Sequence, residues 1–129
     1  MGASDTITHG VRVYARSFYV PDRSVPSRNH YYFGYKIRIS NEGQEPVQLV
    51  SRHWVITDAT GHVEQVRGPG VVGETPRLEP GEAFEYQSAC PLRTASGAMR
   101  GSYRMQRDDG HSFEAEIGDF TLEMPHSLN

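Results

Sequence analysis

The sequence predicts an all-β protein, and three observations support this fold class. No stretch of ten or more residues has the 3.6-residue hydrophobic period of an amphipathic helix. About seven segments instead have the composition or the alternation of strands, and turn-forming residues separate them. The chain of 129 residues suits one domain with its own core. Because antiparallel strands must stack to bury one face each, we expect a single-domain β-sandwich over residues 1–129, immunoglobulin-like or fibronectin type III-like.

The first half of the chain contains four predicted strands, at residues 7–20, 31–40, 47–58 and 62–67. The second strand is the clearest, because apolar and polar residues alternate strictly along it. Residues 22–29, before it, contain Pro26 with serines and arginines, so we expect an exposed loop there. In the third strand the parity of the apolar residues changes, which indicates a β-bulge or burial on both faces. Asp58 and Gly61 bracket a tight hairpin turn before the fourth strand.

The second half contains three more predicted strands, at residues 83–89, 99–106 and 112–124. Pro80 and Gly81 form a turn before the first of them, and Pro91 interrupts the chain after it. In the last strand the apolar parity changes at Gly118, which fits a bulge that contains glycine.

Residues 68–73 spell Gly-Pro-Gly-Val-Val-Gly, the pattern GxGxxG of dinucleotide-binding loops. That fingerprint works only between a strand and a helix, because the helix N-terminus meets the pyrophosphate. Pro76 and Pro80 follow the pattern, and the residues after them alternate, so we expect no helix there. The sequence therefore argues against a Rossmann-type site.

Two interpretations of this glycine stretch remain open. Its glycines can present backbone N–H groups as a nest for a phosphate or a nucleotide, with arginines as counter-charge and nearby glutamates opposing them. Alternatively, they serve a connection between sheets that needs positive φ angles. The candidate loop for a ligand or a partner consists of Gly68, Gly70, Gly73, Arg67 and Arg77.

None of the six histidines has a close ligand spacing such as HxH or HExxH. His53 and His62 flank the predicted hairpin turn, at which Asp58 also lies, so antiparallel pairing could bring them together. These three residues are weak candidates for a divalent metal ion. The alternative is that the histidines are exposed or singly hydrogen-bonded, and no cofactor is expected.

The sequence contains no recognisable catalytic constellation. Nothing places a base beside Cys90, and Ser88 and Ser102 lack the glycines of a nucleophile elbow, so we expect a non-enzymatic protein. Trp54 is expected in the core between the sheets. Tyr32 is predicted to face outward near Arg38, as an aromatic anchor of a protein interface does.

Charge and termini limit the partners. The 13 basic and 16 acidic residues give a net charge of −3 without a run of Lys or Arg, which disfavours nucleic acid. A single cysteine excludes an intrachain disulfide, and the sequence shows neither a signal peptide nor an apolar run that could span a membrane. We expect a cytoplasmic protein that does not bind a membrane and that is a monomer or a homodimer.

The order of residues through the middle of the chain resembles the ApaG family. The residues that carry the resemblance are Arg52-His53-Trp54, Ile56-Thr57-Asp58, Gly61, Val66, Gly68, Gly70-Val71-Val72-Gly73, Pro76, Leu78, Pro80-Gly81, Phe84, Tyr86 and Ser88. Residues 19–21, 31–41 and 101–103 also match, so the similarity covers nearly the whole chain. The resemblance implies a fibronectin type III-like sandwich, and it brings no established catalytic residues.

For function, the resemblance implies an association with cobalt and magnesium tolerance. Related domains in F-box substrate adaptors and in a DNA-polymerase-interacting protein favour protein recognition. We therefore expect a binding module for a protein partner, which uses the loop at residues 68–73 and an adjoining sheet face. The alternative is a binder of phosphate, pyrophosphate or nucleotide, with or without a metal ion, that uses the amides of the same loop.

Overall fold

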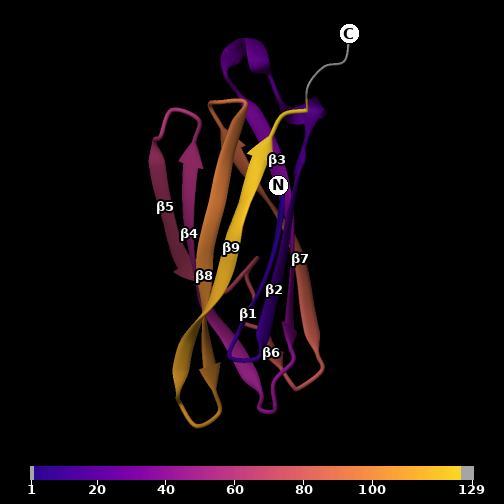
Figure 1. Ribbon diagram of the computed structural model, residues 1–129, viewed down its shortest axis with the longest axis vertical. Helices are drawn as coiled ribbons and strands as arrows, with labels where there is room; N and C mark the ends of the chain where they lie inside the picture. The colour runs from indigo at the N-terminus through magenta and orange to yellow at the C-terminus, as the bar shows by residue number, and fades with distance from the viewer. Residues whose placement is uncertain (1, 126–129) are drawn as a thin grey trace.

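The computed structural model describes residues 2–125, and almost all of them lie in strands or the turns between strands. Two antiparallel sheets stack as a sandwich, so the predicted fold class is confirmed (Figure 1). One sheet has the order β1-β2-β3-β7, and the other has the order β5-β4-β8-β9 with β6 paired to β4. The strands of the described chain are β1 (Ala3–Thr8), β2 (Val11–Tyr19), β3 (Tyr31–Asn41), β4 (Val47–Asp58), β5 (Val63–Pro69), β6 (Arg77–Leu78), β7 (Ala83–Leu92), β8 (Ser96–Arg107) and β9 (Ser112–Glu123).

The prediction of one strand over residues 7–20 is wrong. A turn at His9 and Gly10, whose φ angles are 47° and 84°, divides this stretch into the hairpin β1–β2. The loop at residues 22–29 forms two 3-10 turns, η1 (Pro21–Arg23) and η2 (Pro26–Arg28). Within residues 2–125 no helix is long and apolar enough to span a membrane.

Two further differences concern the second half of the chain. The two-residue strand β6 was not predicted, because two residues carry no periodicity. The strand β7 continues through Pro91 instead of ending before it. It can do so because β7 is an edge strand, where a proline needs no N–H partner on its free side.

Both predicted bulges are present. The pairing of β4 with β8 shifts between Leu49 and Ser51, and the pairing of β8 with β9 shifts opposite Gly118. Each shift changes which residues face inward, and this explains the changes of apolar parity in the sequence.

The core contains an aromatic cluster around Trp54, which is 2% exposed, as predicted for a buried tryptophan. The ring of Tyr35 lies 5.2 Å from it and that of Phe120 lies 6.0 Å from it, both in edge-on contact. Tyr103, on β8, is fully buried beside them at 6.3 Å. These contacts join the two sheets, because Tyr35 lies on β3 and the other three residues lie on the opposite sheet.

The two lateral sides of the sandwich differ. On one side β1 crosses over to β9, and its small hydroxyl residues bond the β9 backbone: Ser4 Oγ donates to Gly118 O at 2.8 Å and Thr6 Oγ1 to Glu116 O at 2.8 Å. Thr8 Oγ1 accepts from Glu116 N at 3.2 Å. We call this the sealed side. We call the other side the open side. There β7 is the edge strand of one sheet and β5 is the edge strand of the other, and Figure 1 shows the two strands at opposite margins of the view.

Candidate functional site

An arginine of the neighbouring strand β4 forms hydrogen bonds with the start of the glycine stretch. Gly68 lies on β5 directly opposite Arg52 of β4. The Arg52 guanidinium donates to Pro69 O at 2.8 Å and to Gly70 O at 3.0 Å. A Cβ atom at Gly68 would lie 2.9–3.0 Å from that guanidinium, so the first glycine of the pattern makes room for the arginine.

The rest of the pattern is a tight, hydrogen-bonded turn. Val71 and Glu74 exchange two backbone bonds of 2.8 and 2.9 Å around Val72 and Gly73, whose φ angles are 43° and 81°. Gly70 N donates to the main chain of β4 at 2.9 Å, and a Cβ at Gly70 would lie 2.3 Å from Glu74 O. The main chain thus uses the amides of Gly70, Val71 and Glu74. Within residues 2–125 the amides of Val72 and Gly73 have no hydrogen-bond partner.

The two arginines of the candidate loop have different surroundings. Arg77 bonds Glu79 and, at 2.6 Å, Asp108, and the hydrogen bond with Asp108 raises the pKa of Arg77 above its ordinary value. Arg67 is exposed on the outer face of β5 opposite His53, and in the described chain it forms no ion pair. Arg67 is therefore the one of the two whose charge is not matched by a neighbour.

The three candidate metal ligands are not gathered at one point. His53 pairs in register with Arg67, five residues beyond His62, and its Nε2 lies 2.8 Å from Gln65 Oε1. The Asp58 carboxylate instead caps its own turn: Oδ1 accepts from Thr60 Oγ1 at 2.7 Å, from Thr60 N and from His62 N. The bond from Thr60 lowers the pKa of Asp58. Among residues 2–125 no group of three His, Cys, Asp or Glu side chains could hold a metal ion. A metal role therefore stays a prediction.

Tyr32 and Arg38 lie six residues apart on β3, in the sheet that does not contain the glycine loop. Tyr32 is half-buried: the Arg23 guanidinium lies 5.2 Å from its ring centroid, and its backbone N donates to Ser24 Oγ at 2.9 Å. Arg38 is exposed and pairs with Glu85 at 3.1 Å. The structure thus brings neither residue together with the glycine loop.

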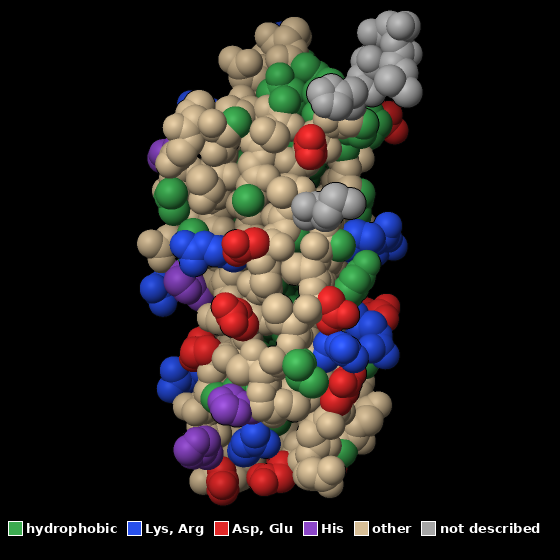
Figure 2. Space-filling model, in the orientation of Figure 1, with side chains coloured by type: hydrophobic (Ala, Val, Ile, Leu, Met, Phe, Trp, Pro, Cys, Tyr) green, Lys and Arg blue, Asp and Glu red, His purple; other side chains and the backbone are tan. Residues whose placement is uncertain are grey.

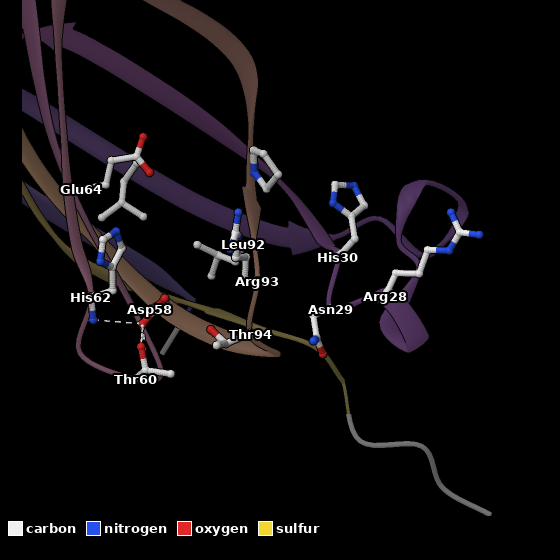
Figure 3. A pocket seen from close by; sticks show the side chains of 12 residues that line it. Arg28, Asn29, His30, Asp58, Thr60, His62, Glu64, Leu92, Arg93 and Thr94 are labelled. Atoms are coloured by element: carbon white, nitrogen blue, oxygen red, sulfur yellow. Dashed lines mark hydrogen bonds between the residues drawn. The ribbon is translucent and has the colours of Figure 1, made fainter.

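A wide hollow of the described surface was not predicted. It is an open cleft of about 1210 Å³ at the end of the sandwich where residues 28–30, 58–64 and 91–94 converge. Figure 3 shows His62 and Glu64 on one wall, His30 across from them, and Leu92 between. Arg28 and Arg93 add positive charge, and neither forms an ion pair within the described residues. Three segments distant in sequence build this cleft, so its existence cannot be predicted from local patterns. Of its lining residues, the sequence indicated only Asp58 and His62 as candidate ligands.

The inner face of the open side is partly apolar. Ile56, Val66, Phe84 and Tyr86 pack on the core but stay half-buried, and we call these four residues the open seam. The Tyr86 hydroxyl bonds that of Tyr103 at 2.5 Å, and burial raises the pKa of Tyr86.

Cys90, near the end of β7, is 4% exposed, and burial raises the pKa of its thiol to about 11. A thiol with this pKa is protonated at neutral pH and is a poor nucleophile. Figure 2 shows the face on which β9 meets β1. There acidic and basic side chains are interspersed, without a continuous patch of one sign.

Comparisons with known proteins agree on one family. The model of the ApaG domain matches residues 21–107. Protein ApaG of Anaeromyxobacter dehalogenans is 54% identical over 126 residues, which cover 98% of this chain and 99% of that protein. Protein ApaG of Brucella anthropi is 54% identical over 119 residues, 92% of each. The crystal structure of the putative ApaA protein from Bordetella pertussis has a TM-score of 0.88 at 49% identity, and the match covers 91% of this chain and 95% of that one.

Proposed function

The chain belongs to the ApaG domain family, and from this premise we propose that it is a non-enzymatic module that binds a protein partner on its open side. The observation that carries the proposal is the difference between the two lateral sides. On the sealed side, β1 hydroxyls bond the edge of β9. On the open side, no segment within residues 2–125 covers the two edge strands, the open seam or the wide cleft. Uncovered strand edges beside apolar surface are the features that partner chains use.

The exposed aliphatic residues of this side support the proposal. Val63, at the start of β5, is 51% exposed, and Val72, at the tip of the glycine loop, is 55% exposed. Val63 begins the edge strand β5 and Val72 lies just beyond its end, and between them Arg67 forms no ion pair with any described residue. Apolar anchors with a polar rim are the usual composition of a protein interface. In this proposal, an effect on cobalt or magnesium tolerance would arise through the partner.

Photo-crosslinking in the living cell tests the proposal. p-Benzoylphenylalanine replaces Val63, Val72 or, as the control, Ile7, which is 54% exposed on β1. We expect adducts with one protein from the first two positions and none from Ile7. An adduct of twice the chain's mass would make the partner a second copy. Equal yield from Ile7, or no adduct from Val63 and Val72, would overturn the proposal.

A second candidate function is phosphate or pyrophosphate binding at the glycine loop. It is favoured by the two amides of Val72 and Gly73 and by the unmatched charge of Arg67. It has less support, because the other loop amides are already bonded to the main chain. Titration with pyrophosphate and Mg²⁺, followed by amide NMR, separates the two. Saturable shifts confined to Val72 and Gly73 would support the anion, and a flat response would remove it.

A further inference from the structure

We infer that the open side binds an extended peptide of alternating apolar and acidic residues, which adds to the sheet as a strand beside β5. This inference rests on the proposed function, because it specifies the partner's conformation and chemistry. Four features of the open side carry it: the direction of the β5 backbone groups, the place where they end, the open seam, and the distribution of charge.

The first feature is which residues of β5 use their backbone groups to bond β4 and which point them outward. Asp58 N donates to His62 O at 3.0 Å, and Gly70 N donates to Val50 O at 2.9 Å, so both ends of the hairpin are fixed. Between these ends, antiparallel pairing alternates bonded and unbonded positions. Even-numbered residues of β5 therefore bond β4. The N–H and C=O groups of Val63, Gln65 and Arg67 point away from the sheet, have no partner in the described part of the chain, and can bond an added strand.

The second feature is the end of this row. Pro69 is the next outward position of β5, and it has no N–H group to donate. The usable edge therefore comprises three donors, which suits one short extended segment. Such a short row is far smaller than a stable interface between two whole sandwiches needs, so a partner peptide fits better than edge pairing of two copies.

The third feature sets the inward side chains of the peptide. An added strand would continue the sheet beyond β5, so every second side chain would face the inside of the sandwich. There Val66 of β5 and Phe84 and Tyr86 of β7 remain half-buried. Apolar side chains at alternate positions would complete the burial of this seam and gain its hydrophobic free energy.

The fourth feature sets the outward side chains of the peptide. Arg67 lies on the outer face of β5 without an ion pair among the described residues, whereas the outer face of β7 carries Glu85, already paired with Arg38. Glu64, the acidic residue of β5, has its side chain on the inner face, opposite Ile56 in the pairing register, so it does not offset the charge of Arg67 on the outer face. Acidic outward residues on the peptide therefore complement Arg67 of β5.

A display library of random seven-residue peptides, selected against the intact chain, tests the inference. Three baits are compared: the natural chain, Gln65→Pro and Gln87→Pro. By the same alternation both glutamines have outward amides on an edge strand, so each proline removes one free donor and no ladder bond. We expect alternating apolar and acidic peptides from the natural chain and from Gln87→Pro. Gln65→Pro should weaken these peptides by about tenfold or more, because it removes a backbone bond and adds a clash.

A second variant keeps the inference falsifiable if the proline disturbs folding. Arg67→Glu leaves the backbone unchanged and should shift the selected outward residues from acidic to basic. Peptides without alternation, no enrichment, or a loss in Gln87→Pro instead of Gln65→Pro would overturn the inference. If crosslinking from Val63 succeeds while these selections fail, the proposed function stands and only the added strand is wrong.

Discussion

The sealed side and the open side of the sandwich differ in what satisfies the backbone groups of their edge strands. On the sealed side, hydroxyls of three successive inward positions of β1 satisfy the edge of β9. On the open side, the outward backbone groups of β5 have no partner among residues 2–125, and the start of the loop after it is joined to β4 by one backbone bond and by two bonds from the side chain of Arg52. The sealed side thus spreads its side-chain bonds over three residues of β1, whereas on the open side one residue, Arg52, makes both side-chain bonds to the start of the loop. Binding surfaces are expected on the side with free backbone groups.

The largest effect is expected from Arg52→Met. The substitution keeps an unbranched side-chain stem but removes the guanidinium, and with it two bonds from a charged donor to Pro69 O and Gly70 O. We expect the free energy of unfolding to fall by about 2–3 kcal/mol, measured by urea denaturation. Hydrogen exchange of the amides at residues 70–74 should also accelerate.

The matched control is Arg67→Met on the neighbouring strand, where the arginine has no ion pair among the described residues. Its effect should stay within about 0.5 kcal/mol. If the two variants are equally stable, Arg52 does not hold the loop, and the contrast between the two sides disappears.

A smaller effect is expected on the sealed side. The double variant Ser4→Ala, Thr6→Val removes two hydroxyl bonds to the β9 backbone, but water can reach part of this edge. We expect a loss of about 1–2 kcal/mol in the free energy of unfolding. The control is Ser102→Ala, whose hydroxyl bonds only the exposed Glu114 side chain at 3.0 Å. A control as damaging as the double variant would contradict the sealing role of β1.

How far the sequence predicts this molecule depends on the range of the interactions. The alternation along β3 is local, and the structure buries Phe33, Ile37 and Ile39 as expected. The turn at His9 and Gly10 was missed because one glycine within a run of β-branched and aromatic residues is a weak turn signal.

The candidate site depends on longer-range contacts. The glycine pattern showed that a loop needs unusual backbone angles, but not that Gly68 makes room for Arg52, sixteen residues earlier. The cleft joins three distant segments, and no periodicity could have placed them together.

Cys90, buried on the inner face of the edge strand β7, is expected to make the stability of the protein depend on pH. Burial raises the pKa of its thiol to about 11 from the ordinary 9.0. The unfolded chain therefore loses this proton first as the pH rises. The stability contributed by the thiol is complete below pH 9 and is lost as the pH rises toward 11.

Unfolding titrations of the natural chain and Cys90→Ala should therefore converge between pH 9 and pH 11. Iodoacetamide should react slowly with the native protein at pH 8 and rapidly in urea. Fast alkylation of the native chain would show that the thiol is accessible and that its pKa is not raised.

The smallest effect is expected at the hairpin turn that borders the cleft. The bond from Thr60 lowers the pKa of Asp58, so the folded chain holds the carboxylate charged to lower pH than the unfolded chain. The stabilisation is present above the ordinary pKa of 3.8 and is lost as the pH falls through the lower folded value. Asp58→Asn keeps an acceptor oxygen for Thr60 and His62 but no longer titrates, so its melting temperature should fall less than that of the natural chain below pH 4. Because the bonds of Asp58 are confined to its own turn, hydrogen exchange should change at residues 60–62 and not along β5. A change that spread along β5 would mean that this turn, like Arg52, holds the open edge in place.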